Sequence, residues 1–268
     1  MNEQELRERK MEEKNARVKK VRKARLILAA IVVVVIVIVI AAVSCGKKDE
    51  TSKESAKATK AKVTTVKEIT TAKPKPRKTV IVGECYVEDF EKYCKDLLPK
   101  GTEYIYKIGV LTGALLEDPF INEGGQSITA IEKAAMYKPD QVFFLCGMNE
   151  TENDTPQITV KHYEKMKKAL QSVNKNVKMI LVSLPPVAKD GLEGYGTNAQ
   201  IRNYNEALKK YADKTENVYY YDIRPLLEDE NGRLKKEANP GDGAHWNVSS
   251  TKEVAKAIKK YSDELSTK

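Results

Sequence analysis

The chain has 268 residues, of which 41% are hydrophobic and 32% charged, and its formal net charge is +9 at pH 7. The excess positive charge lies near the N-terminus: residues 1–25 hold ten Lys and Arg against five acidic residues, and residues 46–78 hold eleven against four. Residues 79–268 are therefore mildly acidic, which excludes nucleic acid as a partner of this part of the chain.

The first predicted element is residues 26–43 (LILAAIVVVVIVIVIAAV), an apolar run without charge, Gly or Pro. At about 1.5 Å per residue a helix of this length spans roughly 27 Å, close to the hydrocarbon thickness of a bilayer. The dense Lys and Arg before it place the N-terminal basic segment, residues 1–25, in the cytoplasm. We therefore predict a single-pass anchor in a bacterial cell membrane, with the rest of the chain on the extracytoplasmic side.

A second interpretation of this region involves Cys45. The residues Ala-Val-Ser-Cys-Gly at 42–46 resemble the cleavage box of a bacterial lipoprotein, in which Cys45 would carry the lipid. The charged lead of residues 1–25 is long for a cleaved signal, so we favour the uncleaved anchor. Either way the domain is tethered to the membrane.

Residues 46–78 follow as a predicted linker. This segment has no aromatic and almost no large apolar residue. It cannot bury enough surface to offset the entropy of an ordered chain, so it is typical of a disordered spacer.

From residue 79 onwards short apolar runs alternate with helical periodicity. The runs typical of buried parallel strands are TVIVG (79–83), YIYKIG (104–109), QVFFLCG (141–147), VKMILVSL (177–184) and NVYYYDI (217–223). The apolar helix faces are Val87, Phe90, Cys94 and Leu97; Ile128, Ile131 and Ala135; Val160, Tyr163, Leu170 and Val173; Ile201, Tyr204, Leu208 and Tyr211; Val254, Ile258, Tyr261 and Leu265. Ser250 and Glu253 have the spacing of a capping box that opens the last helix.

This alternation predicts the fold class of residues 79–268. Five strand–helix repeats indicate a three-layer α/β/α domain with a mostly parallel, five-stranded sheet. About 190 residues suit one such domain. Ligands of open parallel sheets bind beyond the carboxyl ends of the strands, so the functional residues are expected there.

The residues at these strand ends are chemically distinctive. Glu84 and Cys85 follow the first strand, Gly109 ends the second and Asn149 follows the third. Asp242 and His245 lie in a Gly-rich loop beyond the fifth strand. Acyl transfer needs a nucleophile, a base, an acid that orients the base, and hydrogen-bond donors for an oxyanion, and these residues could supply all four.

The pattern resembles the SGNH (GDSL-type) hydrolases, whose flavodoxin-like fold would cover essentially all of residues 79–268. Gly83-Glu84-Cys85 is similar to the family's Gly-Asp-Ser block, with Cys85 at the nucleophilic serine and Glu84 at the aspartate. Gly109 resembles the second-block glycine, and the third block, Gly147-Met148-Asn149-Glu150, resembles Gly-x-Asn-Asp. The fourth block, Asp-x-x-His, matches Asp242 to His245 without change.

The resemblance implies a role for each of these positions. Cys85 would be the nucleophile, His245 the general base, and Asp242 the residue that fixes the tautomer of His245. The Cys85 backbone N–H, the Gly109 N–H and the Asn149 side-chain amide would form the oxyanion hole. The resemblance implies no metal and no cofactor.

The cysteines of the domain differ in their expected environments. Cys94 lies on an apolar helix face and Cys146 ends a buried strand, so both are expected in the core. Cys85 lies at a helix N-terminus, where the macrodipole would favour a thiolate. A disulfide of Cys85 with Cys146 or Cys94 stays open, and a zinc site of Cys85, Cys146 and His245 is a weaker alternative.

Three further polar residues are candidates for a functional role. His162 lies beside the apolar stripe of a charged helix and is expected to be a solvated surface residue. Ser127 is expected to cap a helix, and Ser183 to have a structural role in a loop. None of the three is predicted to be catalytic.

These observations favour a membrane-tethered hydrolase that cleaves an ester, with an O-acyl group on a cell-envelope glycan as the expected substrate. Two alternatives have other functions. The domain could be a catalytically silent module that binds glycan in the former active-site cleft, because the family's serine is replaced. The chain could also be a structural envelope protein whose function lies in the anchor and spacer.

Overall fold

The computed structural model describes residues 77–267. The predicted anchor at 26–43, Cys45 and almost all of the predicted spacer lie outside the described residues. Within the described residues no helix combines the length and the apolar character needed to cross a bilayer.

The centre of the domain is a five-stranded sheet of β1 (Thr79–Gly83), β2 (Glu103–Tyr106), β5 (Gln141–Leu145), β6 (Lys178–Val182) and β7 (Val218–Tyr221). The strand order is β2-β1-β5-β6-β7, and every neighbouring pair is parallel. All residues of β1 and β5 are buried because both faces of these central strands are covered. The predicted five-stranded sheet is confirmed.

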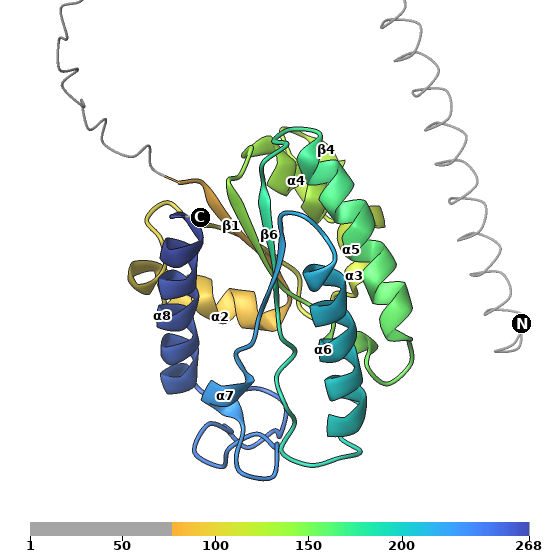
Figure 1. The fold of residues 1–268 in the computed structure, drawn as a ribbon, viewed down its shortest axis with the longest axis vertical. Coiled ribbons are helices and arrows are strands. Elements are labelled where there is room, and N and C mark those ends of the chain that lie inside the picture. The colour runs from red at the N-terminus through yellow and green to blue at the C-terminus, as the bar shows by residue number, and fades with distance from the viewer. Residues whose placement is uncertain (1–76, 268) are drawn as a thin grey trace, which may run out of the picture. The chain divides into compact units, whose positions relative to one another are not determined.

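Helices cover the two faces of this sheet (Figure 1). One face packs against α2 (Cys85–Tyr93), α7 (Arg224–Leu227) and α8 (Val248–Leu265). The other packs against α3 (Thr112–Glu117), α4 (Ala130–Met136) and α5 (Pro156–Gln171), with α6 (Asn198–Asp213) alongside α5. Successive side chains of a strand point to opposite faces of the sheet, which gives two hydrophobic cores. Ile81 and Phe143 belong to the first core, and Val82 and Phe144 belong to the second. The predicted three layers are confirmed.

Several short elements were not predicted. They are α3, α7, the 3-10 helices η1 (Lys95–Leu97) and η2 (Met148–Glu150), and an antiparallel hairpin of β3 (Ile121–Glu123) and β4 (Gln126–Ile128). Ser127 lies exposed in β4, so its prediction as a helix cap is wrong. Thr129 caps α4 instead, in a capping box with Glu132. Elements of three to six residues are too short to show a period.

The start of α8 also differs from the prediction. Asn247 caps this helix, and its side chain accepts a hydrogen bond from the Ser250 N–H at 3.0 Å. The predicted capping box at Ser250 and Glu253 is therefore wrong, because asparagine caps a helix as well as serine does and lies one turn earlier. The earlier start places the cap of α8 two residues after His245.

Candidate active site

Gly83 allows the end of β1 to lie close to β5, just before Cys85. A Cβ atom added to Gly83 would lie 2.1 Å from the Leu145 carbonyl oxygen and 2.9 Å from Val87. Only glycine therefore allows β1 to approach β5 this closely as the chain turns. The Glu84 N–H donates to the Leu145 oxygen at 3.2 Å, and Cys85 becomes the first residue of α2, half-buried at the carboxyl end of the sheet.

The structure brings Cys85, His245 and Asp242 together. Cys85 Sγ lies 3.1 Å from His245 Nε2, and His245 Nδ1 lies 2.6 Å from Asp242 Oδ2. Cys85 and His245 are separated by 160 positions in the sequence, and only the folding of the sheet and α8 places them side by side. The order thiol, imidazole, carboxylate is the geometry of a nucleophile, its base and the acid that orients the base.

The loop before α8 holds the carboxylate in place. Asp242 Oδ1 accepts the N–H groups of Ala244 and His245 at 2.9 and 3.0 Å, which leaves Oδ2 for the imidazole. Burial alone would raise the pKa of Asp242, but these two N–H groups and the His245 ring lower it below its ordinary value. The side chain is therefore an ionised acceptor at neutral pH.

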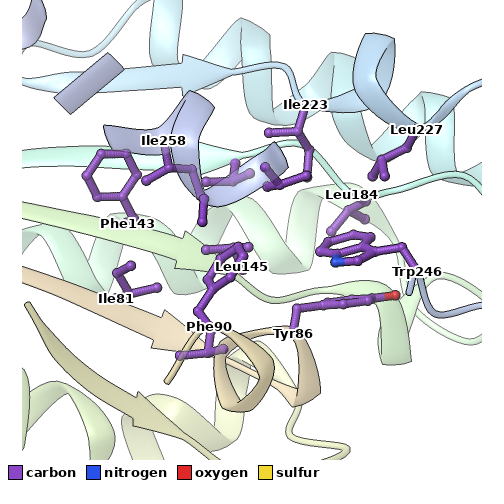
Figure 2. Packing of buried hydrophobic residues seen from close by; sticks show 14 of the residues in the cluster. Ile81, Tyr86, Phe90, Phe143, Leu145, Leu184, Ile223, Leu227, Trp246 and Ile258 are labelled. Atoms are coloured by element: carbon purple, nitrogen blue, oxygen red, sulfur yellow. The ribbon is translucent and has the colours of Figure 1, made fainter. Parts of the chain in front are cut away.

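An aromatic pair lies beside the imidazole, with the Tyr86 ring centroid 5.6 Å from that of His245. The rings of Tyr86 and Trp246 stack with centroids 4.2 Å apart, and the Tyr86 hydroxyl donates to the Ala244 carbonyl oxygen at 3.2 Å. In Figure 2 the Trp246 ring lies between Leu184 and Tyr86, which belongs to the same helix as Phe90. Both rings are 2% exposed, so the residue directly after Cys85 and the residue directly after His245 are fixed in the core. Tyr195 adds a ring edge-on to His245, with centroids 6.2 Å apart.

The charge state of Cys85 differs from the prediction. Burial, followed by the negative charge of Glu84, raises the pKa of the Cys85 thiol to about 12. The helix macrodipole contributes about 0.3–1 kcal/mol, less than one pKa unit, whereas burial shifts a pKa by up to about 3–5 units. The predicted free thiolate is therefore wrong. The raised pKa keeps the resting group a thiol, so a nucleophilic role for Cys85 would require a base to take its proton.

The predicted oxyanion donors lie in different environments. Asn149 is half-buried in η2, and its side-chain N–H groups donate to the Glu84 carboxyl and, at 3.4 Å, to the Val110 carbonyl oxygen. Gly109 lies in an exposed turn with a φ of +68°, a conformation that glycine adopts without strain. The roles of Asn149 and Gly109 as donors to an oxyanion stay predictions.

The other cysteines of the domain and Ser183 lie in its interior. Cys94 and Cys146 are buried, as predicted, and both are free thiols, as is Cys85. Among residues 77–267 no group of three or more His, Cys, Asp or Glu side chains could hold a metal ion. Ser183 is buried and accepts the Ile223 N–H at 2.9 Å, which confirms its structural role.

His162 was predicted wrongly as a solvated residue. It is half-buried, and its Nδ1 lies 2.8 Å from the Thr112 hydroxyl on α3. Burial lowers the pKa of this imidazole. The packing of α5 against α3 covers the residue, and the sequence period of α5 alone did not reveal that contact.

Two buried carboxyl groups were not assigned a function from the sequence. Glu84 is 1% exposed and Glu150 is 2% exposed. Burial is the main cause that raises the pKa of Glu84 to about 8, and burial also raises that of Glu150. Their positions in the sequence could have indicated a role in the site, because Glu84 directly precedes Cys85 and Glu150 directly follows Asn149.

The raised pKa of Glu84 predicts how stability changes with pH. Between about pH 4.5 and pH 8 the folded state keeps the proton that the unfolded state releases, so the free energy of unfolding should fall as pH rises. At 1.36 kcal/mol per pKa unit the full effect is about 5 kcal/mol. We expect Glu84→Gln to flatten this dependence, measured by urea unfolding at both ends of the window. An equally steep fall in the variant would contradict the assignment, and the exposed Glu103→Gln provides the control.

Comparisons with known proteins agree with this architecture. Residues 119–249 match the sequence model of the GDSL-like Lipase/Acylhydrolase family, a range that includes Asn149, Asp242 and His245. No curated protein matches the chain. The match shows that this part of the chain is similar in sequence to that family.

Solved structures share the fold. A GDSL-like lipase from Bacteroides thetaiotaomicron is 18% identical, with a TM-score of 0.57 over 73% of this chain and 92% of that one. A protein assigned as an acylhydrolase, from Bacteroides fragilis, is 18% identical, with a TM-score of 0.58 over 72% and 91%. The C-terminal catalytic domain of peptidoglycan O-acetyltransferase A from Streptococcus pneumoniae is 19% identical, with a TM-score of 0.50 over 71% and 93%. The family match and the shared fold support a hydrolase that acts on esters.

Proposed function

We propose that this domain, in which residues 119–249 match the GDSL-like lipase/acylhydrolase family model, cleaves an ester through Cys85. The observation that carries the proposal is the pair of contacts from Cys85 Sγ to His245 Nε2, 3.1 Å, and from His245 Nδ1 to Asp242 Oδ2, 2.6 Å. These two distances support the proposal because a general base must contact the nucleophile, and an orienting acid must contact the base.

The reaction proceeds in two halves. The Cys85 sulfur attacks the ester carbonyl carbon while the thiol proton passes to His245 Nε2, and Asp242 stabilises the imidazolium. The oxyanion is bound by the Cys85 and Gly109 backbone N–H groups and the Asn149 amide. The alkoxide leaves with the proton from His245, giving a thioester. Water then attacks the thioester, its proton passes to His245, and Cys85 regains that proton as the acid is released.

The proposed setting is the outer face of a bacterial membrane. Residues 26–43 would anchor the chain, with Cys45 as the alternative lipid attachment point, and residues 46–78 would tether the domain. A flexible linker of this length has a root-mean-square span of about 30 Å. We propose an O-acyl group on a cell-envelope glycan as the substrate, supported by this tether and by the shared fold with a pneumococcal peptidoglycan O-acetyltransferase domain.

A catalytically silent glycan-binding domain is the second candidate. The observation that favours it is the thiol itself, because its pKa is raised to about 12 and it stands where the family has serine. The intact contact between His245 and Asp242 favours the enzyme, since a binding module has no need of an oriented base.

Released acetate distinguishes these two functions. The full chain is incubated with an O-acetylated cell-wall glycan and, as the matched control, with the same glycan after its esters have been removed by base. The enzyme is expected to release acetate from the first glycan in proportion to protein concentration. Retention of the chain on the glycan with no acetate released would instead support the binding module.

A further inference from the structure

Glu84 is a buried acid for which the proposed reaction gives no role. It is the N-cap of α2, directly before Cys85, and its side chain does not cap that helix. Its two oxygens reach across to η2 instead: Oε1 accepts the Met148 N–H at 3.3 Å, and Oε2 accepts the Asn149 side-chain amide. The carboxyl therefore joins the end of β1 to the segment after β5.

The contact with Asn149 uses one of two N–H groups of that amide. The same nitrogen also lies 3.4 Å from the Val110 carbonyl oxygen, which is long for a hydrogen bond. Val110 directly follows Gly109, the other predicted donor. One side of the Asn149 amide is thus held firmly by a buried carboxyl, and the other has a weak partner that a stronger acceptor could replace.

We propose that Glu84 is a positioning residue that fixes the Asn149 amide, so that the N–H group now on Val110 is ready for the oxygen of the reacting carbonyl. This role rests on the proposed ester hydrolysis. A donor fixed before the reaction costs no reorganisation when negative charge develops, whereas a freely rotating amide would have to be ordered in that step.

The protonation of Glu84 adds a testable pH dependence. The ionisable groups whose charges couple to this carboxyl are Cys85 and Tyr86 on α2, Cys146 after β5, Glu150 in η2, Tyr163 on α5 and Tyr195 in the loop before α6. Burial is the main cause that raises the pKa of Glu84 to about 8, so the carboxyl is mostly neutral at pH 7. Its ionisation at higher pH would place a negative charge beside the developing oxyanion, and kcat should therefore fall on the alkaline side.

A double-mutant cycle on the full chain tests this role. Asn149→Ala is expected to lower kcat by roughly 10²–10³-fold, the usual loss for an oxyanion donor. Glu84→Ala should lower kcat at least tenfold in the parent, but by less than about twofold in the Asn149→Ala background, because it acts through that amide. Losses that multiply independently would overturn the proposal. Asp96→Ala, which removes an exposed acid in η1, is the control and should keep the parent rate.

The conservative variant supplies a second readout. Glu84→Gln cannot ionise and keeps one carbonyl oxygen that can accept the Asn149 amide, but its NH2 group cannot accept the Met148 N–H. The variant should therefore keep more of kcat at pH 7 than Glu84→Ala does, and it should lose the alkaline decline. An unchanged decline near pH 8 in Glu84→Gln would count against the role of Glu84.

A third measurement separates this role from the proposed function. Side-chain amide NMR signals of Asn149, in asparagine-labelled protein, should shift as Glu84 titrates, and this shift should be absent in Glu84→Ala. If the Asn149 amide signals do not shift as Glu84 titrates, the positioning role is overturned. Absence of ester hydrolysis in the parent would overturn the proposed function instead, while a titrating amide would still support the hold of Glu84 on Asn149.

Discussion

Replacing Cys85 by alanine is expected to lower kcat/KM for a short aryl ester by roughly 10⁴–10⁶-fold, as loss of the nucleophile does in a triad enzyme. The reason is that Sγ is the atom 3.1 Å from His245 Nε2, and no other thiol of the described residues lies exposed at that imidazole. The measurement is the rate of phenol release by parent and variant under identical conditions.

Two further variants make this result specific to Cys85. Cys94→Ala removes a thiol that is 1% exposed and packed at the end of the same helix, so activity should persist with a modest loss of stability. Cys85→Ser places a hydroxyl at the same position. The hydroxyl can still form a hydrogen bond with His245, but it is a weaker nucleophile than the thiol. A serine variant more active than the parent would indicate a retired enzyme, and equal rates in the parent and Cys85→Ala would refute the thiol mechanism.

Asp242→Asn is expected to lower kcat by about 10⁴-fold. In the variant an NH2 group replaces Oδ2 and points an N–H group at His245 Nδ1. If the amide turns over, its oxygen makes only a weaker contact. The imidazole then loses the carboxylate that fixes the tautomer in which Nε2 is free to accept a proton. The backbone contacts of Oδ1 with Ala244 and His245 can remain, so the loop should keep its conformation. Steady-state kinetics at saturating ester measure the loss.

A matched aspartate provides the control for this variant. Asp229 also accepts backbone N–H groups through its Oδ1, from Asn231 and Arg233, in an exposed turn away from the imidazole. Asp229→Asn should leave kcat unchanged. A similar fall in both variants would indicate that Asp242 matters only for the loop, and its orienting role would have to be abandoned.

Much of the fold could be predicted because its buried strands are long apolar runs. TVIVG and QVFFL are read directly as covered strands, and they are β1 and β5. The site residues could be found because parallel strands bring their carboxyl ends to one edge, where motif residues such as Cys85 and His245 accumulate. The short elements α3, α7 and the β3–β4 hairpin carry no period over their few residues, so tertiary contacts define them.

The electrostatics of the site could not be predicted from the same sequence. The helix N-terminus at Cys85 indicated a thiolate, but the sequence does not show how much solvent the fold removes from the sulfur. Nor does it show that Glu84, one residue earlier, turns away from its own helix to bind Asn149, which lies 65 positions later. Charge states depend on burial and on partners distant in the chain, and only the folded structure supplies both.

Trapping the covalent intermediate tests the central claim most directly. The full chain is mixed with an activated acetyl ester, quenched in acid within the first turnover, digested and analysed by mass spectrometry. The account predicts one acetyl group in thioester linkage on the peptide that contains Cys85, absent when His245 is replaced by alanine. Rapid ester cleavage with no acetyl group on Cys85, or with the acetyl group on another residue, would contradict it.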